Sequence, residues 1–301
     1  MSILSVHNLS KSFNAYKAVN DLNFKVKQGE VFGLLGLNGA GKSTTIRCLL
    51  SLIKSDSGTI QWIGKELQSN RSAILSQIGC IVERPDHYLH LSAKQNLLFS
   101  AGMYGVQLSR TAVYGLLELV GLNGRGDAKV KTYSQGMKQR LALACAMAHN
   151  PSFILLDEPT NGLDPQGMID LRVLIQRLKA EKNISFLVSS HLLHEMELIA
   201  DSMMIMHKGT AILSGQVHEL LTDDQLMVTI ETDDAFALMN AMSDTKWYES
   251  MRCDGAQQLL LKAARKEMPY LHSKLMENRM PIYQVQSKRK LEDLFLSLTH
   301  E

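Results

Sequence analysis

The sequence predicts an α/β fold built on a mostly parallel β-sheet, with an antiparallel β subdomain, a helical insertion and a small α+β domain at the C-terminal end. Two observations favour the parallel sheet. The apolar run 31–35 is followed by a glycine-rich turn and a helix from Lys42, and short apolar runs alternate with helical patterns over 152–214. Parallel strands are buried on both faces and are joined by crossover helices, which produces this pattern.

Length and composition are those of an ordinary globular protein. The chain has 301 residues, 45% of them hydrophobic and 21% charged, which is enough for a large domain and a smaller one. A net charge of +2 lacks the basic excess of a dedicated nucleic-acid binder. The four cysteines have no metal-like spacing, and we expect them to be reduced and buried: Cys48, Cys80, Cys145 and Cys253. We find no signal peptide and no apolar run of about 18 residues, so a membrane role is expected to come through a partner.

The N-terminal half contains two kinds of pattern. Residues 2–31 alternate apolar and polar positions, which favours antiparallel strands. A helix is expected over 42–52, followed by short strands at 59–63 and 78–82. Over 92–150 the periodicity becomes helical with no strand between, which indicates a helical insertion.

The second half alternates strands with helices and then changes character. The expected elements are strands at 152–157 and 184–189, helices at 166–182 and 192–200, and paired strands at 202–207 and 210–214. A polar turn after residue 221 indicates a boundary, which gives domains 1–221 and 222–301, the first with a helical subdomain at about 84–150. The second domain is expected to have strands at 227–232, 258–262 and 282–285, and helices at 234–242, 266–277 and 290–298.

The segment 36–44, GLNGAGKST, fits the phosphate-binding P-loop spacing G-x-x-x-x-G-K-[ST]. Glycines allow the backbone to turn its N–H groups inward, and the helix that follows adds N-terminal donors. Lys42 can reach the β- and γ-phosphates, and the Ser43 hydroxyl can ligate Mg²⁺. The loop therefore predicts a nucleoside triphosphate and Mg²⁺, held by Gly36, Asn38, Gly39, Ala40, Gly41, Lys42, Ser43 and Thr44.

Two further segments carry candidate site residues. Asp157 ends a hydrophobic strand and is a candidate for the second Mg²⁺-linked carboxylate, and Glu158 can orient the attacking water. Ser134 and Gly136 open an alanine-rich helix, where a hydroxyl and free N–H groups make a second anion site. One chain does not need two phosphate sites, but a head-to-tail pair of chains does.

In this order, the segments resemble the nucleotide-binding subunit of an ATP-binding cassette (ABC) transporter over about residues 3–221. The resemblance implies an ATPase domain whose homodimer sandwiches two ATP molecules, each between one P-loop and Ser134 and Gly136 of the other chain. It also implies that Phe13 stacks on adenine, although alone it would be interpreted as a core aromatic. Asp164 matches the D-loop, Glu158 the catalytic glutamate, and His191 the switch histidine that contacts the γ-phosphate.

The sequence departs from the family pattern at three places. Leu37 replaces a common proline, and Tyr133 to Met137 read YSQGM where the family has LSGGQ. Glu83 stands where the family usually has the Q-loop glutamine, and a carboxylate there could bind Mg²⁺ more strongly while being repelled by the phosphates. A surface role for Glu83 remains the alternative. With Pro85, it resembles subunits that export bacitracin-like and lantibiotic peptides.

The function predicted is therefore an ATPase subunit at the cytoplasmic face of the membrane, bound through a separate permease and working as an exporter, with no direct nucleic-acid contact. A soluble ABC ATPase acting on ribosomes or nucleic acid is the alternative, and it is disfavoured by the single cassette and near-neutral charge. A GTPase switch lacks the Asn-Lys-x-Asp motif. A peptide, lipid, sodium ion or drug as cargo, and dimer contact, regulation or docking as the role of 222–301, stay open.

Overall fold

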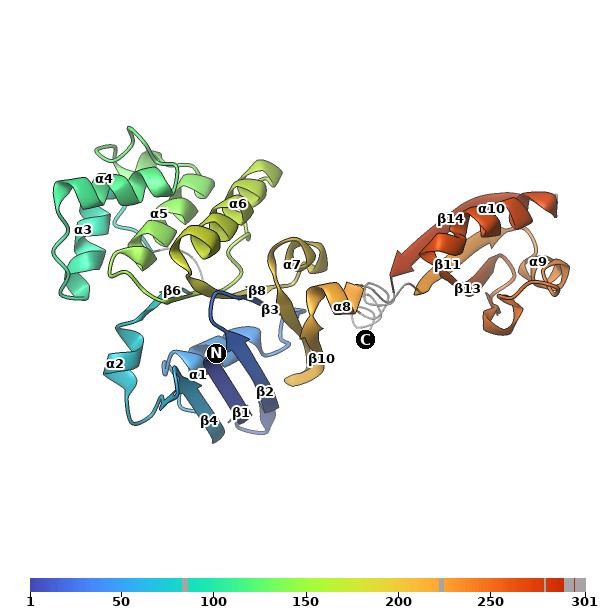
Figure 1. The fold of residues 1–301 in the computed structure, drawn as a ribbon, viewed down its shortest axis with the longest axis horizontal. Helices are drawn as coiled ribbons and strands as arrows, with labels where there is room; N and C mark the ends of the chain where they lie inside the picture. Colours follow the sequence, from blue (N-terminus) through green and yellow to red (C-terminus); the bar gives the residue numbers. More distant parts are fainter. Residues whose placement is uncertain (83–85, 222–224, 279, 290–294, 296–301) are drawn as a thin grey trace. The chain divides into compact units, whose positions relative to one another are not determined.

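The computed structural model describes the whole chain apart from residues 83–85, 222–224, 279, 290–294 and 296–301. The chain divides into two compact units, Met1–Gln216 and Val217–Glu301. Figure 1 shows the elements of both units along the chain.

A six-stranded sheet is the centre of the first unit. Its strand order is β10-β9-β3-β8-β7-β6, and every neighbouring pair is parallel except β10 with β9. The strands are β3 (Val31–Gly36), β6 (Ile78–Ile81), β7 (Phe153–Leu156), β8 (Ser185–Ser190), β9 (Ser202–His207) and β10 (Thr210–Gln216). β3, β7 and β8 are buried at every position, as the near-continuous apolar runs predict. The prediction of a mostly parallel sheet is confirmed.

The antiparallel subdomain is a second sheet of the first unit, with the order β2-β1-β4-β5. Its strands are β1 (Ser2–Phe13), β2 (Tyr16–Lys27), β4 (Ser57–Trp62) and β5 (Lys65–Glu66). One hydrophobic core joins both sheets and includes Ile46 and Leu49 of helix α1 (Lys42–Leu49). Trp62 packs edge-on against Phe153 with ring centroids 4.7 Å apart, which fixes one sheet against the other.

Three helices of the first unit lie together on one side of it. α3, α4 and α5 form a helical block beside β6, and β1, β2 and β4 lie to the other side of the six-stranded sheet (Figure 1). The remaining bounds are α2 (Arg71–Leu75), α3 (Ala93–Met103), α4 (Arg110–Leu119), η1 (Val130–Thr132), α5 (Gln135–Met147), α6 (Pro165–Lys182) and α7 (Leu193–Ile199). A capping box of Ser92 and Gln95 starts α3, and serine N-caps start α4 and α5.

From β11 onwards the second unit has a β-α-β-β-α-β order, the split-βαβ arrangement. Its all-antiparallel sheet has the order β12-β13-β11-β14. The bounds are α8 (Val217–Leu221), β11 (Gln225–Thr232), α9 (Ala235–Ala241), η2 (Tyr248–Ser250), β12 (Arg252–Asp254), β13 (Gln258–Ala264), η3 (Arg265–Glu267), α10 (Met268–Glu277) and β14 (Ile282–Arg289). The prediction of a small α+β domain is confirmed, β12 was not predicted, and the predicted helix 290–298 lies outside the described residues apart from Phe295.

One carboxylate of the second unit, that of Glu267, is held by three donors that lower its pKa. Glu267 Oε2 accepts hydrogen bonds from Trp247 Nε1 at 3.0 Å and from the Ala264 N–H at 3.1 Å, and Oε1 lies 2.6 Å from Lys246 Nζ. The bond from Lys246, followed by those from Trp247 and Ala264, lowers the pKa of Glu267 to about 2.

We therefore expect Glu267→Gln to lower the melting temperature at neutral pH. The folded pKa lies below the ordinary value of 4.5, so this stabilisation is present above pH 4.5 and is lost as the pH falls towards 2. Thermal unfolding followed by tryptophan fluorescence at pH 7 and at about pH 3 measures the difference, with the exposed Glu249→Gln as the charge-matched control. A deficit of equal size at both pH values would contradict the assignment.

Candidate functional site

The loop between β3 and α1 is shaped by two glycines that no other residue can replace. A Cβ on Gly36 would lie 2.6 Å from the Met206 carbonyl oxygen, and one on Gly41 would lie 2.3 Å from that of Ala18. Gly41 also has φ +102°, a conformation that L side chains rarely adopt. The loop is therefore packed closely between β9 and β2, directly before the N-terminus of α1.

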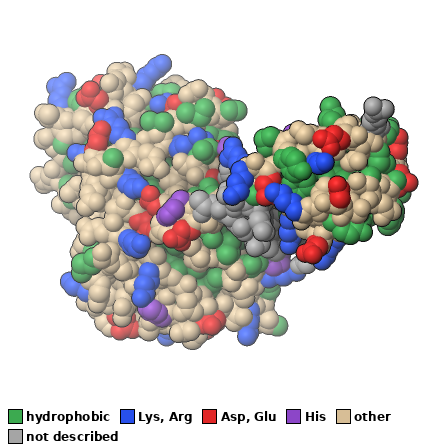
Figure 2. Space-filling model, turned by 45° about the vertical axis from the view of Figure 1, so that its right-hand side comes forward, with side chains coloured by type: hydrophobic (Ala, Val, Ile, Leu, Met, Phe, Trp, Pro, Cys, Tyr) green, Lys and Arg blue, Asp and Glu red, His purple; other side chains and the backbone are tan. Residues whose placement is uncertain are grey.

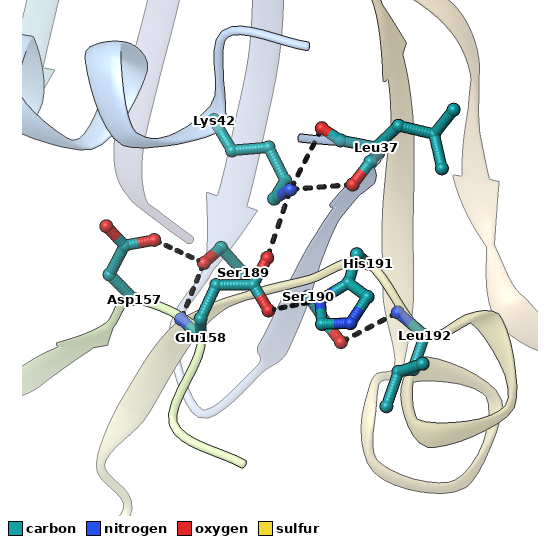
Figure 3. A network of polar contacts seen from close by, with 9 residues as sticks. Leu37, Lys42, Asp157, Glu158, Ser189, Ser190, His191 and Leu192 are labelled. Atoms are coloured by element: carbon teal, nitrogen blue, oxygen red, sulfur yellow. Dashed lines mark hydrogen bonds and ion pairs between the residues drawn. The ribbon is translucent and has the colours of Figure 1, made fainter. Parts of the chain in front are cut away.

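Lys42 is buried, and its ammonium is held by oxygens at the mouth of this loop. Nζ donates to the carbonyl oxygens of Gly36 at 2.6 Å and Leu37 at 3.2 Å. It also lies 3.0 Å from Oε1 of Glu158 (Figure 3). Because only 5% of the Lys42 side chain is exposed, its charge depends on these partners. The same ammonium can exchange them for phosphate oxygens.

Glu158 lies between two basic side chains. Its second oxygen, Oε2, is 2.8 Å from Nδ1 of His191, so the carboxylate lies between Lys42 and His191 (Figure 3). The residue has φ +46°, a left-handed conformation that is uncommon outside glycine and that often marks a functional position. The structure thus brings together Lys42, Glu158 and His191, which the sequence predicted separately.

Ser189 is a site residue that the sequence analysis missed. Its hydroxyl donates to Oδ1 of Asp157 at 2.6 Å and accepts from the Glu158 N–H at 2.8 Å (Figure 3). It therefore positions both acidic residues from the neighbouring strand β8. The available signal was a fully buried polar residue at the end of an apolar strand.

Asp157 and Ser43 offer the donors that suit Mg²⁺. Asp157 is 3% exposed and its carboxylate follows β7, while Ser43 follows Lys42 at the start of α1. Carboxylate and hydroxyl oxygens are hard ligands, and protein Mg²⁺ sites commonly use one or two of them together with substrate phosphates. The chemistry of these two groups fits the ion, and Glu83, the third predicted ligand, lies outside the described residues.

Phe13 is a surface aromatic, which excludes the core interpretation. It ends β1 with 47% of its surface exposed, and Lys11 Nζ lies over its ring at 5.4 Å from the centroid. Asp56 holds that ammonium at 2.8 Å and also accepts from the Ser12 N–H. One face of the Phe13 ring is therefore packed by a fixed cation, and the residue remains accessible for stacking.

Three further predicted residues, Ser134, Gly136 and Asp164, lie at helix starts. Ser134 is the N-cap of α5 and accepts from the Met137 N–H at 3.3 Å, and Asp164 is the N-cap of α6 and accepts from the Gly167 N–H at 3.2 Å. A Cβ on Gly136 would meet nothing within 4 Å. Within the described part of the chain, no hydrogen bond or ion pair joins these residues to the cluster around Lys42.

Comparison with known proteins agrees with this geometry. The family model described as ABC transporter matches residues 19–161. The bacitracin transport ATP-binding protein of Bacillus licheniformis is 38% identical over 99% of this chain and 97% of its own length. The lantibiotic transport ATP-binding protein of Streptococcus pyogenes is 40% identical over 71% of this chain and 91% of its own length. Among solved structures, cbiO1 from Clostridium perfringens, part of the ABC transporter complex cbiONQ, has a TM-score of 0.67 and 26% identity, covering 81% of this chain and 96% of that one.

We expect Ser189→Ala to lower the turnover number for ATP hydrolysis at least tenfold while ATP still binds. The substitution leaves the Asp157 carboxylate and the Glu158 N–H without their shared partner, and an unsatisfied buried polar group costs about 1–3 kcal/mol. Steady-state ATPase assays and an equilibrium binding titration measure the two effects.

Ser190→Ala is the matched control. Ser190 is equally buried and adjacent, but among the described residues its hydroxyl is bonded to the nearby Leu192 N–H at 3.0 Å and not to Asp157 or Glu158. Wild-type turnover in Ser189→Ala, or an equal loss in Ser190→Ala, would show that Ser189 does not position the two acidic residues.

Proposed function

This chain belongs to the ABC transporter family as an ATP-binding subunit that couples ATP hydrolysis to transport, and we propose that two copies drive a separate membrane permease as an exporter. The observation that carries the proposal is the Glu158 carboxylate, held at 3.0 Å from Lys42 Nζ and 2.8 Å from His191 Nδ1 at the mouth of the P-loop.

The proposed chemistry begins with the release of Glu158. The Lys42 ammonium binds phosphate oxygens in place of the carboxylate, and Glu158 then orients the attacking water. His191 holds the other carboxylate oxygen and approaches the γ-phosphate. Ser43 and Asp157 would hold Mg²⁺, which when bound neutralises charge on the phosphates. Phe13 stacks on adenine, and the N–H groups of residues 38–44 surround the phosphates.

A second copy of the chain is expected to complete each site. Ser134 and Gly136 lie at the N-terminus of α5, where unpaired N–H groups favour an anion, yet they have no bond to the cluster around Lys42 in the described residues. Gly162, two residues before Asp164, lies beside Gln135, so the D-loop and the start of α5 share one surface. A head-to-tail homodimer would place this surface over the partner's P-loop.

The permease is expected to dock in a groove of about 610 Å³ beside the helical block. Tyr88, Phe99, Met103 and Tyr104 line it and are at least 41% exposed, which suits an apolar protein segment. Burial raises the pKa of Cys145, at the same groove, to about 12, so its thiol stays protonated. Cys80 and Ile81 of β6 line the same groove, so movement of the sheet edge can be passed through it to a partner.

The location proposed is the cytoplasmic face of the membrane. No helix among the described residues is long and apolar enough to cross a bilayer, so contact with the membrane is assigned to the permease. Residues 1–221 form the proposed ATPase domain, including the helical subdomain at about 84–150, and 222–301 the accessory domain. The two relatives are named for transport of bacitracin and of a lantibiotic, which favours the direction of export for this chain.

The alternative is a soluble ABC ATPase acting on ribosomes or nucleic acid. On the face shown in Figure 2, basic and acidic side chains are interspersed over both units rather than gathered into a basic surface. Nucleic-acid binding relies on such a surface. ATPase activity stimulated by RNA or DNA, in protein purified without any membrane subunit, would favour the alternative.

We expect Glu158→Gln to bind ATP but to lose hydrolysis at least a hundredfold, and to persist as an ATP-bound dimer. The amide cannot accept a proton from the attacking water. Size-exclusion chromatography with ATP measures the dimer, and phosphate release measures turnover. Lys42→Ala should instead lose ATP binding, and the exposed Glu249→Gln should behave as wild type. Undiminished turnover in Glu158→Gln would overturn the role of this carboxylate.

We expect Glu83→Gln to change the Mg²⁺ dependence of hydrolysis while leaving ATP binding in place. A neutral amide is a weaker Mg²⁺ ligand than a carboxylate, so half-maximal activity should need more Mg²⁺. ATPase rates over a Mg²⁺ titration make the comparison. If activity and its Mg²⁺ dependence are both unchanged, Glu83 has the surface role that the sequence analysis left open.

A further inference from the structure

A tyrosine connects the Phe13 hairpin to the P-loop. Phe13 and Tyr16 are directly opposite each other in the β1–β2 register, across a tight turn in which Asn14 has φ +53°. Opposite residues of an antiparallel pair project from the same side of the sheet. The Tyr16 hydroxyl donates to the carbonyl oxygen of Gly39 at 3.1 Å. Tyr16 thus begins beside the aromatic platform and ends at the phosphate loop.

The position of Tyr16 corresponds to that of the ribose in a bound nucleotide. The proposed function puts the base on Phe13 and the phosphates in the loop that contains Gly39, and the ribose is the group that joins the two. The Tyr16 side chain spans the same interval, and with 56% of its surface exposed it is accessible to a ligand.

The hydroxyl of Tyr16 can still accept a hydrogen bond. A phenol provides one O–H donor and can also accept hydrogen bonds. The donor is used by Gly39, so the oxygen lone pairs are left to accept from another hydroxyl. We propose that Tyr16 recognises the ribose of the bound nucleotide by accepting a hydrogen bond from its 2′- or 3′-hydroxyl. This inference rests on the proposed function.

The platform beside Tyr16 is fixed before any nucleotide binds. Asp56 accepts from Lys11 Nζ at 2.8 Å and from the Ser12 N–H at 2.6 Å, and Lys11 covers one face of Phe13. The bond from Lys11, together with that from Ser12, lowers the pKa of Asp56, so the carboxylate stays charged at neutral pH. A hairpin held in this way presents Tyr16 with little ordering cost on binding.

A purely structural role of Tyr16, in which it only positions the P-loop, predicts a different result. If Tyr16 only holds the Gly39 carbonyl, its loss would weaken every ligand of the P-loop equally, including inorganic tripolyphosphate, and would not depend on the sugar. Recognition of the ribose instead makes the effect of Tyr16 depend on the hydroxyl groups of the ligand.

The test is isothermal titration of the full chain with ADP, 2′-deoxy-ADP and 3′-deoxy-ADP, since diphosphates avoid turnover. We expect wild-type protein to bind at least one deoxy analogue about 3- to 10-fold more weakly than ADP, the range of one hydrogen bond. Tyr16→Phe keeps the ring and should remove this preference, binding ADP as weakly as that analogue. Tyr283→Phe, which loses a hydroxyl bonded to Asp233 in the second unit, should keep it.

Three outcomes would overturn the ribose contact: equal wild-type affinity for all three nucleotides, a preference that survives in Tyr16→Phe, or an equal loss of tripolyphosphate and ADP binding in that variant. Phe13→Ala separates this failure from failure of the proposed function, because it should weaken ADP and both deoxy analogues by the same factor. If Phe13→Ala binds ADP as tightly as wild type, the base does not stack on Phe13, and the ribose contact of Tyr16 is then ruled out as well.

Discussion

The buried ammonium of Lys42 is the constraint on which the site depends. A charge this far from water must be surrounded by oxygens, and the chain provides two carbonyls of its own loop and the carboxylate of Glu158. The first two fix the loop around the lysine. The third ties that loop to the end of β7, 116 residues later in the sequence. His191 and Ser189 then hold the carboxylate and the backbone of Glu158 from β8.

The strand order explains why these groups meet. In the order β3-β8-β7, three neighbouring parallel strands end at the same edge of the sheet. The P-loop follows β3, Asp157 and Glu158 follow β7, and His191 follows β8, so each side chain arrives at one place without a long loop. Phe13 and Tyr16 come from the other sheet, which the shared core around Trp62 holds in position.

Local motifs were predictable from the sequence because their chemistry is contained in a few consecutive residues. The P-loop and the acidic pair at Asp157 belong to this class. The strand–helix alternation and the α+β character of the second unit were predictable for another reason, because the periodicity of apolar residues indicates each element. The sequence shows Ser189 as a polar residue in an apolar strand, but its bond to Asp157 was not predictable. That bond depends on the pairing of β7 with β8 and on their register, where Leu156 is opposite Val188. Periodicity identifies buried strands but not which of them are neighbours.

Glu158 has two partners that cannot both be kept during hydrolysis. While Lys42 is paired with Oε1 and His191 with Oε2, both carboxylate oxygens are occupied by a basic side chain and neither is free to orient water. Phosphate oxygens carry more negative charge than one carboxylate, so they compete for the same ammonium on favourable terms. In the proposed mechanism, their arrival releases Glu158 towards water while His191 still holds Oε2. On this proposal the ion pair of Lys42 and Glu158 couples ligand binding to activation, because the group that would orient water is released only when the phosphates are present.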